Sequence, residues 1–190
     1  YTVGISLALL VYLAGTEGLN AWHVILTTIY AFWLIVVKPQ SETVWTEVQS
    51  FFAIFFGTFA TSLLANNLTP LTGVIVCFII GYGASRHILI QGEDHDFTLT
   101  TFIFGLLLAE LSWISYHWTI VYYLGDVNKI ALPQLPIMAS LMSFVFMRGY
   151  KSALYHDGKI RVDDILVPAV FSVILMFVML FFFSEPIFNI

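Results

Sequence analysis

Long apolar stretches alternate with short polar connections along nearly the whole chain. About 20 helical residues are needed to cross the roughly 30 Å hydrocarbon core of a bilayer. Six of the stretches reach or approach that length, and a shorter one opens the sequence. The pattern predicts a polytopic membrane protein with about seven spans, near residues 2–14, 22–37, 48–65, 71–90, 97–124, 130–147 and 165–183.

The composition agrees with a membrane protein and excludes an ordinary soluble domain. Apolar residues make up 59% of the chain, charged residues make up 10%, and the mean hydropathy is +0.91. Soluble chains have roughly 45–50% apolar and about 25% charged residues. Because the hydrocarbon core offers no water to backbone N–H and C=O groups, each span has to be helical. We therefore expect residues 1–190 to form a single all-α transmembrane helix bundle with short loops and no strands.

Lysine and arginine are concentrated in alternate loops. Short loops make neighbouring helices antiparallel, so seven crossings place the N-terminus, Lys38, Arg86 and residues 148–161 on one side and Lys129 on the other. Loops rich in lysine and arginine tend to remain on the cytoplasmic side. The sequence thus predicts an integral, multi-pass protein whose basic loops and N-terminus are cytoplasmic and whose C-terminus is outside.

The charge distribution and the motifs exclude several classes of function. The formal net charge is −5, the acidic residues are scattered over loops, and there is no basic tract, so we expect no nucleic-acid partner. The sequence contains no cofactor fingerprint, no nucleophile motif and a single cysteine, Cys77, within an apolar stretch. We therefore expect no cofactor, and the sequence favours a protein that is not an enzyme.

The most distinctive chemistry lies in the expected span 97–124. Glu110 is near its midpoint, and Trp113 and His117 follow on the same helical face at i+3 and i+7. A charged group at this depth is costly, and intramembrane ionisable residues commonly serve ion or proton pathways. We regard Glu110, Trp113 and His117, with Tyr82 as a polar neighbour, as candidates for a proton relay. The alternative is a protonated Glu110 hydrogen-bonded to a hydroxyl group on a neighbouring helix, with His117 in the outer interface.

Histidines and carboxylates also gather in the expected cytoplasmic loops. Because these side chains bind divalent metals, the weak metal candidates are His87, Asp94, His95, Asp96, His156 and Asp157. Their spacing matches no metal motif, however. A solvated turn that ends in a helix N-cap explains the acidic residues around Asp94 and Asp96 more simply.

Five basic residues on the same side are candidates for contacts with lipid head groups. Each Lys or Arg near a membrane surface adds about 1 kcal/mol of attraction to anionic lipids. The candidates are Arg86, Arg148, Lys151, Lys159 and Arg161. Residues that only determine the topology have the same appearance in a sequence, so this alternative stays open.

Small residues recur at four-residue spacing in two of the expected spans. Such series let helices approach closely. One series consists of Gly57, Thr61 and Ala65, and the other consists of Gly73, Cys77 and Gly81. We expect tight helix packing along both.

Three functions from different classes remain. A non-catalytic membrane subunit or scaffold is our first choice, because the chain is small, its loops are short and many aromatic surfaces are available to a protein partner or a second copy of the chain. A small proton-coupled transporter or channel would use Glu110 and His117. A membrane-embedded lipid-modifying enzyme would require the cytoplasmic His and Asp residues to converge. In all three cases the lipid bilayer is a partner.

Overall fold

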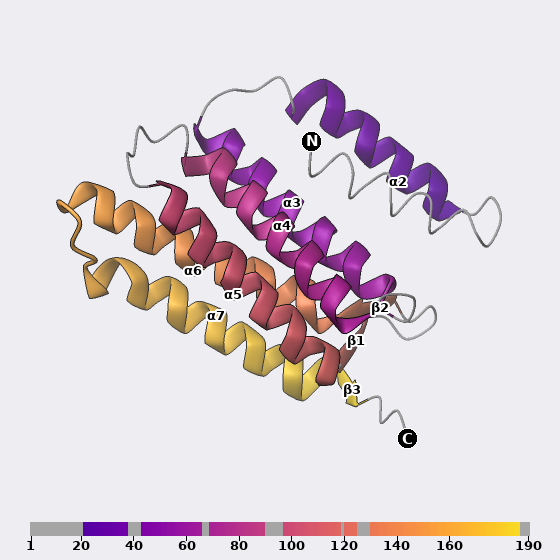
Figure 1. Ribbon diagram of the computed structural model, residues 1–190. Helices are drawn as coiled ribbons and strands as arrows, with labels where there is room; N and C mark the ends of the chain where they lie inside the picture. The colour runs from indigo at the N-terminus through magenta and orange to yellow at the C-terminus, as the bar shows by residue number, and fades with distance from the viewer. Residues whose placement is uncertain are drawn as a thin grey trace.

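The computed structural model describes residues 21–37, 43–65, 69–89, 97–118, 120–124 and 130–186. This part of the chain is mostly helical, with long helices lying side by side and a small sheet at one end (Figure 1). The all-α expectation therefore holds for the bulk of the fold. The expected span 2–14 lies outside the described residues.

The helices are connected in simple sequential order. Each long helix runs back along the previous one, so alternate helix ends meet at the same end of the bundle (Figure 1). The elements are α2 (Ala21–Phe32) with a π-helical continuation η1 (Trp33–Val37), α3 (Thr43–Leu63), α4 (Pro70–Leu89), α5 (Phe97–His117), β1 (Ile120–Leu124), β2 (Ile130–Pro133), α6 (Gln134–Tyr155), α7 (Val162–Phe183) and β3 (Ser184–Pro186).

Three segments among the described residues are long and apolar enough to cross a membrane. They are Pro70–Leu89 in α4, Thr98–His117 in α5 and Val162–Phe182 in α7. Helices α3 and α6 have 21 and 22 residues, which suffices in length, but they are less apolar. Three apolar helices are consistent with a membrane protein, whereas the seven-span topology stays a prediction.

Helices α3, α4 and α5 pack closely because glycine lies at their contacts. A Cβ atom added to Gly81 of α4 would lie 2.6 Å from Leu108 Cδ1 and 3.2 Å from the Cα of Gly105 in α5. A Cβ atom on Gly57 of α3 would lie 3.0 Å from Ile80 Cδ1 in α4. All three distances are shorter than ordinary carbon contacts of about 3.5–4.0 Å. The expected tight packing is thus found at Gly57 and Gly81, whereas a Cβ atom on Gly73 would have only Ser112 Oγ nearby, at 3.8 Å.

The apolar core lies where α3, α4, α5 and α6 meet. Ala53, Ile54 and Phe104 are almost fully buried there, and the rings of Phe104 and Phe146 are 4.6 Å apart between centroids. A hydroxyl group adds a polar link, because Ser50 Oγ of α3 donates to the Ala84 carbonyl of α4 at 3.1 Å. The four helices thus form one packed unit.

A three-stranded antiparallel sheet closes one end of the bundle and corrects the expectation of helices only. The span expected over 97–124 ends as a helix at His117, and the span expected over 130–147 begins as strand β2 before α6 runs on to Tyr155. The strand order is β2-β1-β3. The run Ile120–Leu124 is rich in β-branched and aromatic residues, which favour strands. Hydropathy alone does not distinguish such a run from the end of a helix.

Tyr122 is the buried centre of this sheet. It pairs with Leu132 of β2 and Ser184 of β3, and its side chain is fully buried. Burial raises the pKa of Tyr122, because the charged phenolate is disfavoured away from water. The neutral phenol therefore belongs to the sheet core, where its hydroxyl group has no hydrogen-bond partner among the described residues.

Candidate functional site

Helix α5 has one face packed against its neighbours and one exposed face. The exposed face carries Leu99, Phe102, Ile103, Leu106, Leu107, Glu110, Trp113, Ile114 and His117. These residues follow helical spacing and form a continuous apolar surface that a single carboxylate interrupts. We call this surface the α5 face.

Glu110 lies on the α5 face rather than inside the bundle. It is three residues, or about 4.5 Å, from the centre of the helix Phe97–His117. Within the described part of the chain its carboxyl group has no hydrogen-bond or ion-pair partner, and the alternative of a protonated Glu110 bonded to a hydroxyl group stays a prediction. An unpaired carboxyl group at this depth is costly in a bilayer. Its exposure therefore requires an explanation that the described residues do not supply.

His117 is held by Trp113 at the end of α5. Its Nδ1–H donates to the Trp113 carbonyl at 2.9 Å, and the two rings are 4.5 Å apart between centroids. Tyr116 also lies against the histidine, with centroids 5.5 Å apart. Glu110 is seven residues away, or about 10.5 Å along the helix axis. The structure thus places Trp113 and His117 together but does not bring His117 into contact with Glu110.

Tyr82 belongs to a separate stack on α4. Its ring lies 6.1 Å from the ring of Phe78, and the guanidinium carbon of Arg86 lies 6.0 Å from its centroid. These are contacts between residues four apart on one helix. The sequence-based grouping of Tyr82 with Glu110 therefore has no contact to support it.

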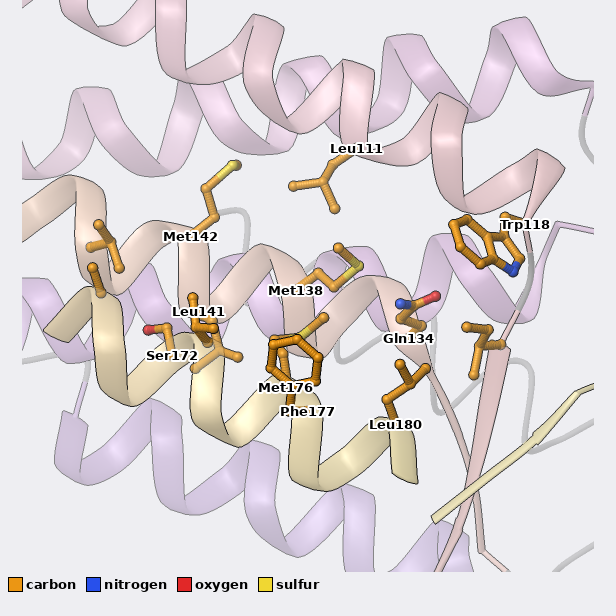
Figure 2. A pocket seen from close by; sticks show the side chains of 14 residues that line it. Leu111, Trp118, Gln134, Met138, Leu141, Met142, Ser172, Met176, Phe177 and Leu180 are labelled. Atoms are coloured by element: carbon orange, nitrogen blue, oxygen red, sulfur yellow. The ribbon is translucent and has the colours of Figure 1, made fainter. Parts of the chain in front are cut away.

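A concave pocket lies between α5, α6 and α7, next to the sheet. Figure 2 shows Leu111 and Trp118 on one wall, Met138, Leu141 and Met142 on α6, and Met176 and Leu180 on the opposite wall. The pocket has a volume of about 590 Å³. Its lining consists of Leu111, Trp118, Ile120, Gln134, Met138, Leu141, Met142, Val145, Ala169, Ser172, Val173, Met176, Phe177 and Leu180. We call it the α5–α7 pocket.

The α5–α7 pocket is almost entirely apolar. None of its lining residues carries an ionisable side chain, and Gln134, Trp118 and Ser172 supply its polar atoms. Ser172 Oγ is buried and has no hydrogen-bond partner among the described residues. Three of the five methionines line the pocket, and methionine adapts readily to irregular apolar guests. The sequence did not reveal this site, because its residues come from three separate helices and the start of β1, and no single segment shows how these elements are placed.

The basic residues that the structure describes gather at the end of the bundle opposite the sheet. Arg86 lies over Tyr82, and Arg148 lies over Phe144 with 5.6 Å between the guanidinium carbon and the ring centroid. Lys151 pairs with Glu47 of α3 at 2.5 Å and is not available as a separate cation. The exposed lipid-head-group candidates are therefore Arg86, Arg148, Lys159 and Arg161.

A compact corner joins α6 to α7 at this end. Ser152 Oγ accepts a hydrogen bond from the Arg161 N–H at 2.9 Å and donates to Asp164 Oδ2 at 2.7 Å. His156 Nε2 lies 3.4 Å from the same carboxylate oxygen. Asp157 and Gly158 have positive φ angles of 51° and 81°, which turn the chain sharply. His156 and Asp164 thus help to build a turn.

The metal candidates do not converge where they are described. Asp94, His95 and Asp96 lie outside the described residues, whereas His87 is at the end of α4 and His156 faces Asp164. Among the described residues, no group of three or more His, Cys, Asp or Glu side chains is arranged to hold a metal ion. Residues 21–37, 43–65, 69–89, 97–118, 120–124 and 130–186 thus offer no geometry for the lipid-modifying chemistry that the sequence left open.

Comparison of the chain with protein-family models, with curated proteins and with solved structures gives no match. The α5 face and the α5–α7 pocket are therefore the features of the described residues that bear on function.

Proposed function

We propose that this protein is a non-catalytic membrane subunit that assembles with another transmembrane protein through the α5 face. The observation that carries the proposal is Glu110, an exposed carboxylate close to the centre of an apolar helix. Carboxylates within a bilayer are almost always paired or directed away from lipid. A partner helix that supplies a hydrogen-bond donor or a basic group at the same depth would remove the cost.

The surroundings of Glu110 suit a helix-to-helix interface. Trp113 and Ile114 are about half exposed beside it, and Phe102 and Leu106 extend the surface along the helix. Large aromatic side chains around one polar anchor are typical of the energetically important part of an interface. Helix α4 already covers the opposite side of α5 through Gly81 and Gly105, so the α5 face is the side left for a partner.

The test is native mass spectrometry of the tagged protein, gently extracted from its own membrane, for the wild type, Glu110→Gln and Glu110→Leu. We expect a stoichiometric heteromeric complex for the wild type. Glu110→Leu should lower the complex fraction about tenfold, since an interhelical hydrogen bond in a membrane contributes about 1–2 kcal/mol. The Glu110→Gln side chain can still form hydrogen bonds, so this variant should lower the fraction of protein in the complex by a smaller factor.

Phe171→Leu is the matched control, because it changes an exposed apolar residue of α7, away from the α5 face. It should leave the complex intact. A wild-type protein that emerges only as a monomer, or a Glu110→Leu variant that assembles normally, would contradict the proposal.

The transport alternative receives less support from the geometry. Glu110 and His117 are not in contact, and the α5–α7 pocket is lined by neither residue. The lipid-enzyme alternative lacks a converged set of side chains among the described residues.

A further inference from the structure

We propose that the α5–α7 pocket binds one hydrocarbon chain of a membrane lipid, from the leaflet at the sheet end of the bundle. This inference is independent of the partner proposed for the α5 face, because Glu110 does not line the pocket. It rests on the length of the pocket, its position along the helices and the chemistry of its lining.

The pocket has the length of one leaflet. Its lining on α6 runs from Gln134 to Val145, and its lining on α7 runs from Ala169 to Leu180. Each run covers 11 helical steps, or about 16 Å. Half of a hydrocarbon core of roughly 30 Å is about 15 Å. The pocket is therefore as long as a lipid chain that reaches from the interface to the bilayer centre.

The pocket also lies at the depth of one leaflet. Gln134 is the first residue of α6, and Val145 is close to the middle of that 22-residue helix. On α7, Leu180 is near the C-terminal end and Ala169 is near the middle. One end of the pocket is thus beside the sheet, and the other is near the centre of both helices.

The lining is complementary to an uncharged apolar guest. It contains no charged side chain, and its volume of about 590 Å³ is typical of ligand pockets, which measure roughly 300–1,000 Å³. Trp118 and Gln134 lie together at the sheet end (Figure 2). Tryptophan favours the membrane interface, so the polar part of the lipid belongs at this end. The apolar remainder of the lining then surrounds the chain.

The bilayer itself is the source of the guest. Val173 and Phe177 line the pocket and are about half exposed on α7, the most apolar of the three membrane-compatible helices. A chain gains no hydrophobic free energy by moving from lipid to this pocket. It gains close contacts, however, with side chains that an empty pocket would leave without neighbours.

The experiment uses the protein in phosphatidylcholine vesicles that contain a small fraction of phosphatidylcholine with a photoreactive diazirine in one acyl chain. Light converts the diazirine to a carbene, and mass spectrometry maps the labelled residues. We expect labelling of Met138 and Leu141 on α6, which are recessed between α5 and α7. Lipids that only surround the protein would label exposed faces and leave these two residues unmodified.

Two matched variants of α7 test the assignment. Val173 and Val170 are exposed to similar extents, 53% and 47%, but only Val173 lines the pocket. Val173→Trp should lower labelling of Met138 and Leu141 about fivefold because the indole occupies the space of the chain, whereas Val170→Trp should not change it. Ala169→Leu, which narrows the deep end, provides a second, milder variant. Circular dichroism verifies that each variant folds.

Equal labelling of Met138 and Leu141 in both tryptophan variants, or no labelling of them in the wild type, would overturn the proposal. Neither outcome depends on assembly through Glu110. A negative result would therefore overturn the lipid chain in the α5–α7 pocket without affecting the partner proposed for the α5 face.

Discussion

The two sides of α5 differ in how closely the neighbouring helix approaches. Toward α4, Gly81 and Gly105 bring the backbones so close that an added Cβ atom would overlap the other helix. Toward α7, leucine, methionine and phenylalanine side chains line a pocket of about 590 Å³. Since α4 and α7 are both apolar enough to cross a membrane, hydrophobicity does not explain the contrast. The size of the side chains at the contact does.

The largest effect is expected from a bulky residue in the α4–α5 contact. Gly81→Leu should lower the free energy of unfolding by about 1–3 kcal/mol or more, because the new side chain meets Leu108 and the backbone of Gly105. Denaturant titration in detergent micelles measures the change. Gly73→Leu is the control, because a Cβ atom there has only Ser112 Oγ nearby, at 3.8 Å. Equal losses for both variants would remove the distinction between the two sides of α5.

An intermediate effect is expected where α7 is fastened to α6. Ser152→Ala removes the acceptor of the Arg161 N–H and a donor to Asp164, which should cost about 1 kcal/mol. A loss of about 1 kcal/mol corresponds to a factor of about five in an equilibrium constant, so hydrogen exchange at the Arg161 amide should accelerate about fivefold.

Ser140→Ala is the matched control for the serine at this corner. Ser140 Oγ is buried on the same helix without a hydrogen-bond partner among the described residues, so its removal should be neutral or slightly stabilising. If Ser152→Ala and Ser140→Ala change the free energy of unfolding and the exchange rate of the Arg161 amide equally, the hydrogen bonds of Ser152 do not fasten α7 to α6.

The smallest effect is expected from adding volume to the α5–α7 pocket. Val145→Phe should change the free energy of unfolding by less than about 0.5 kcal/mol, because the ring enters open space. The same denaturant titration applies. A loss as large as that of Gly81→Leu would show that this side of α5 is as tightly packed as the other.

Local signals in the sequence predicted close packing along α4 but not the end of α5. Four-residue spacing of Gly73, Cys77 and Gly81 is visible within one helix, and it indicated close packing without knowledge of the partner. The run Ile120–Leu124 falls within an expected helical span, because an apolar run satisfies the hydropathy of a span whether it forms a helix or a strand. Its β-branched and aromatic residues, followed by Gly125 and Asp126, were the available signal for a hairpin.

The position of Glu110 along the helix could be predicted, but the direction of its side chain could not. Helix α5 is apolar on all sides, so its sequence does not indicate which face meets α4. The small residue Gly105 was the one hint, and it lies on the face that packs against Phe78. The α5–α7 pocket depends on the mutual placement of three helices, which no single segment encodes.

The order of the strands has a consequence for the α5–α7 pocket. Strand β1 follows α5, strand β3 follows α7, and the two are paired directly. Paired strands lie about 4.7–4.9 Å apart, so backbone hydrogen bonds fix the separation of these helix ends. The width of the pocket at its sheet end is therefore a property of the backbone. Substitutions in the side chains that line the pocket can change which guest fits, but they leave the width of the pocket at its sheet end unchanged.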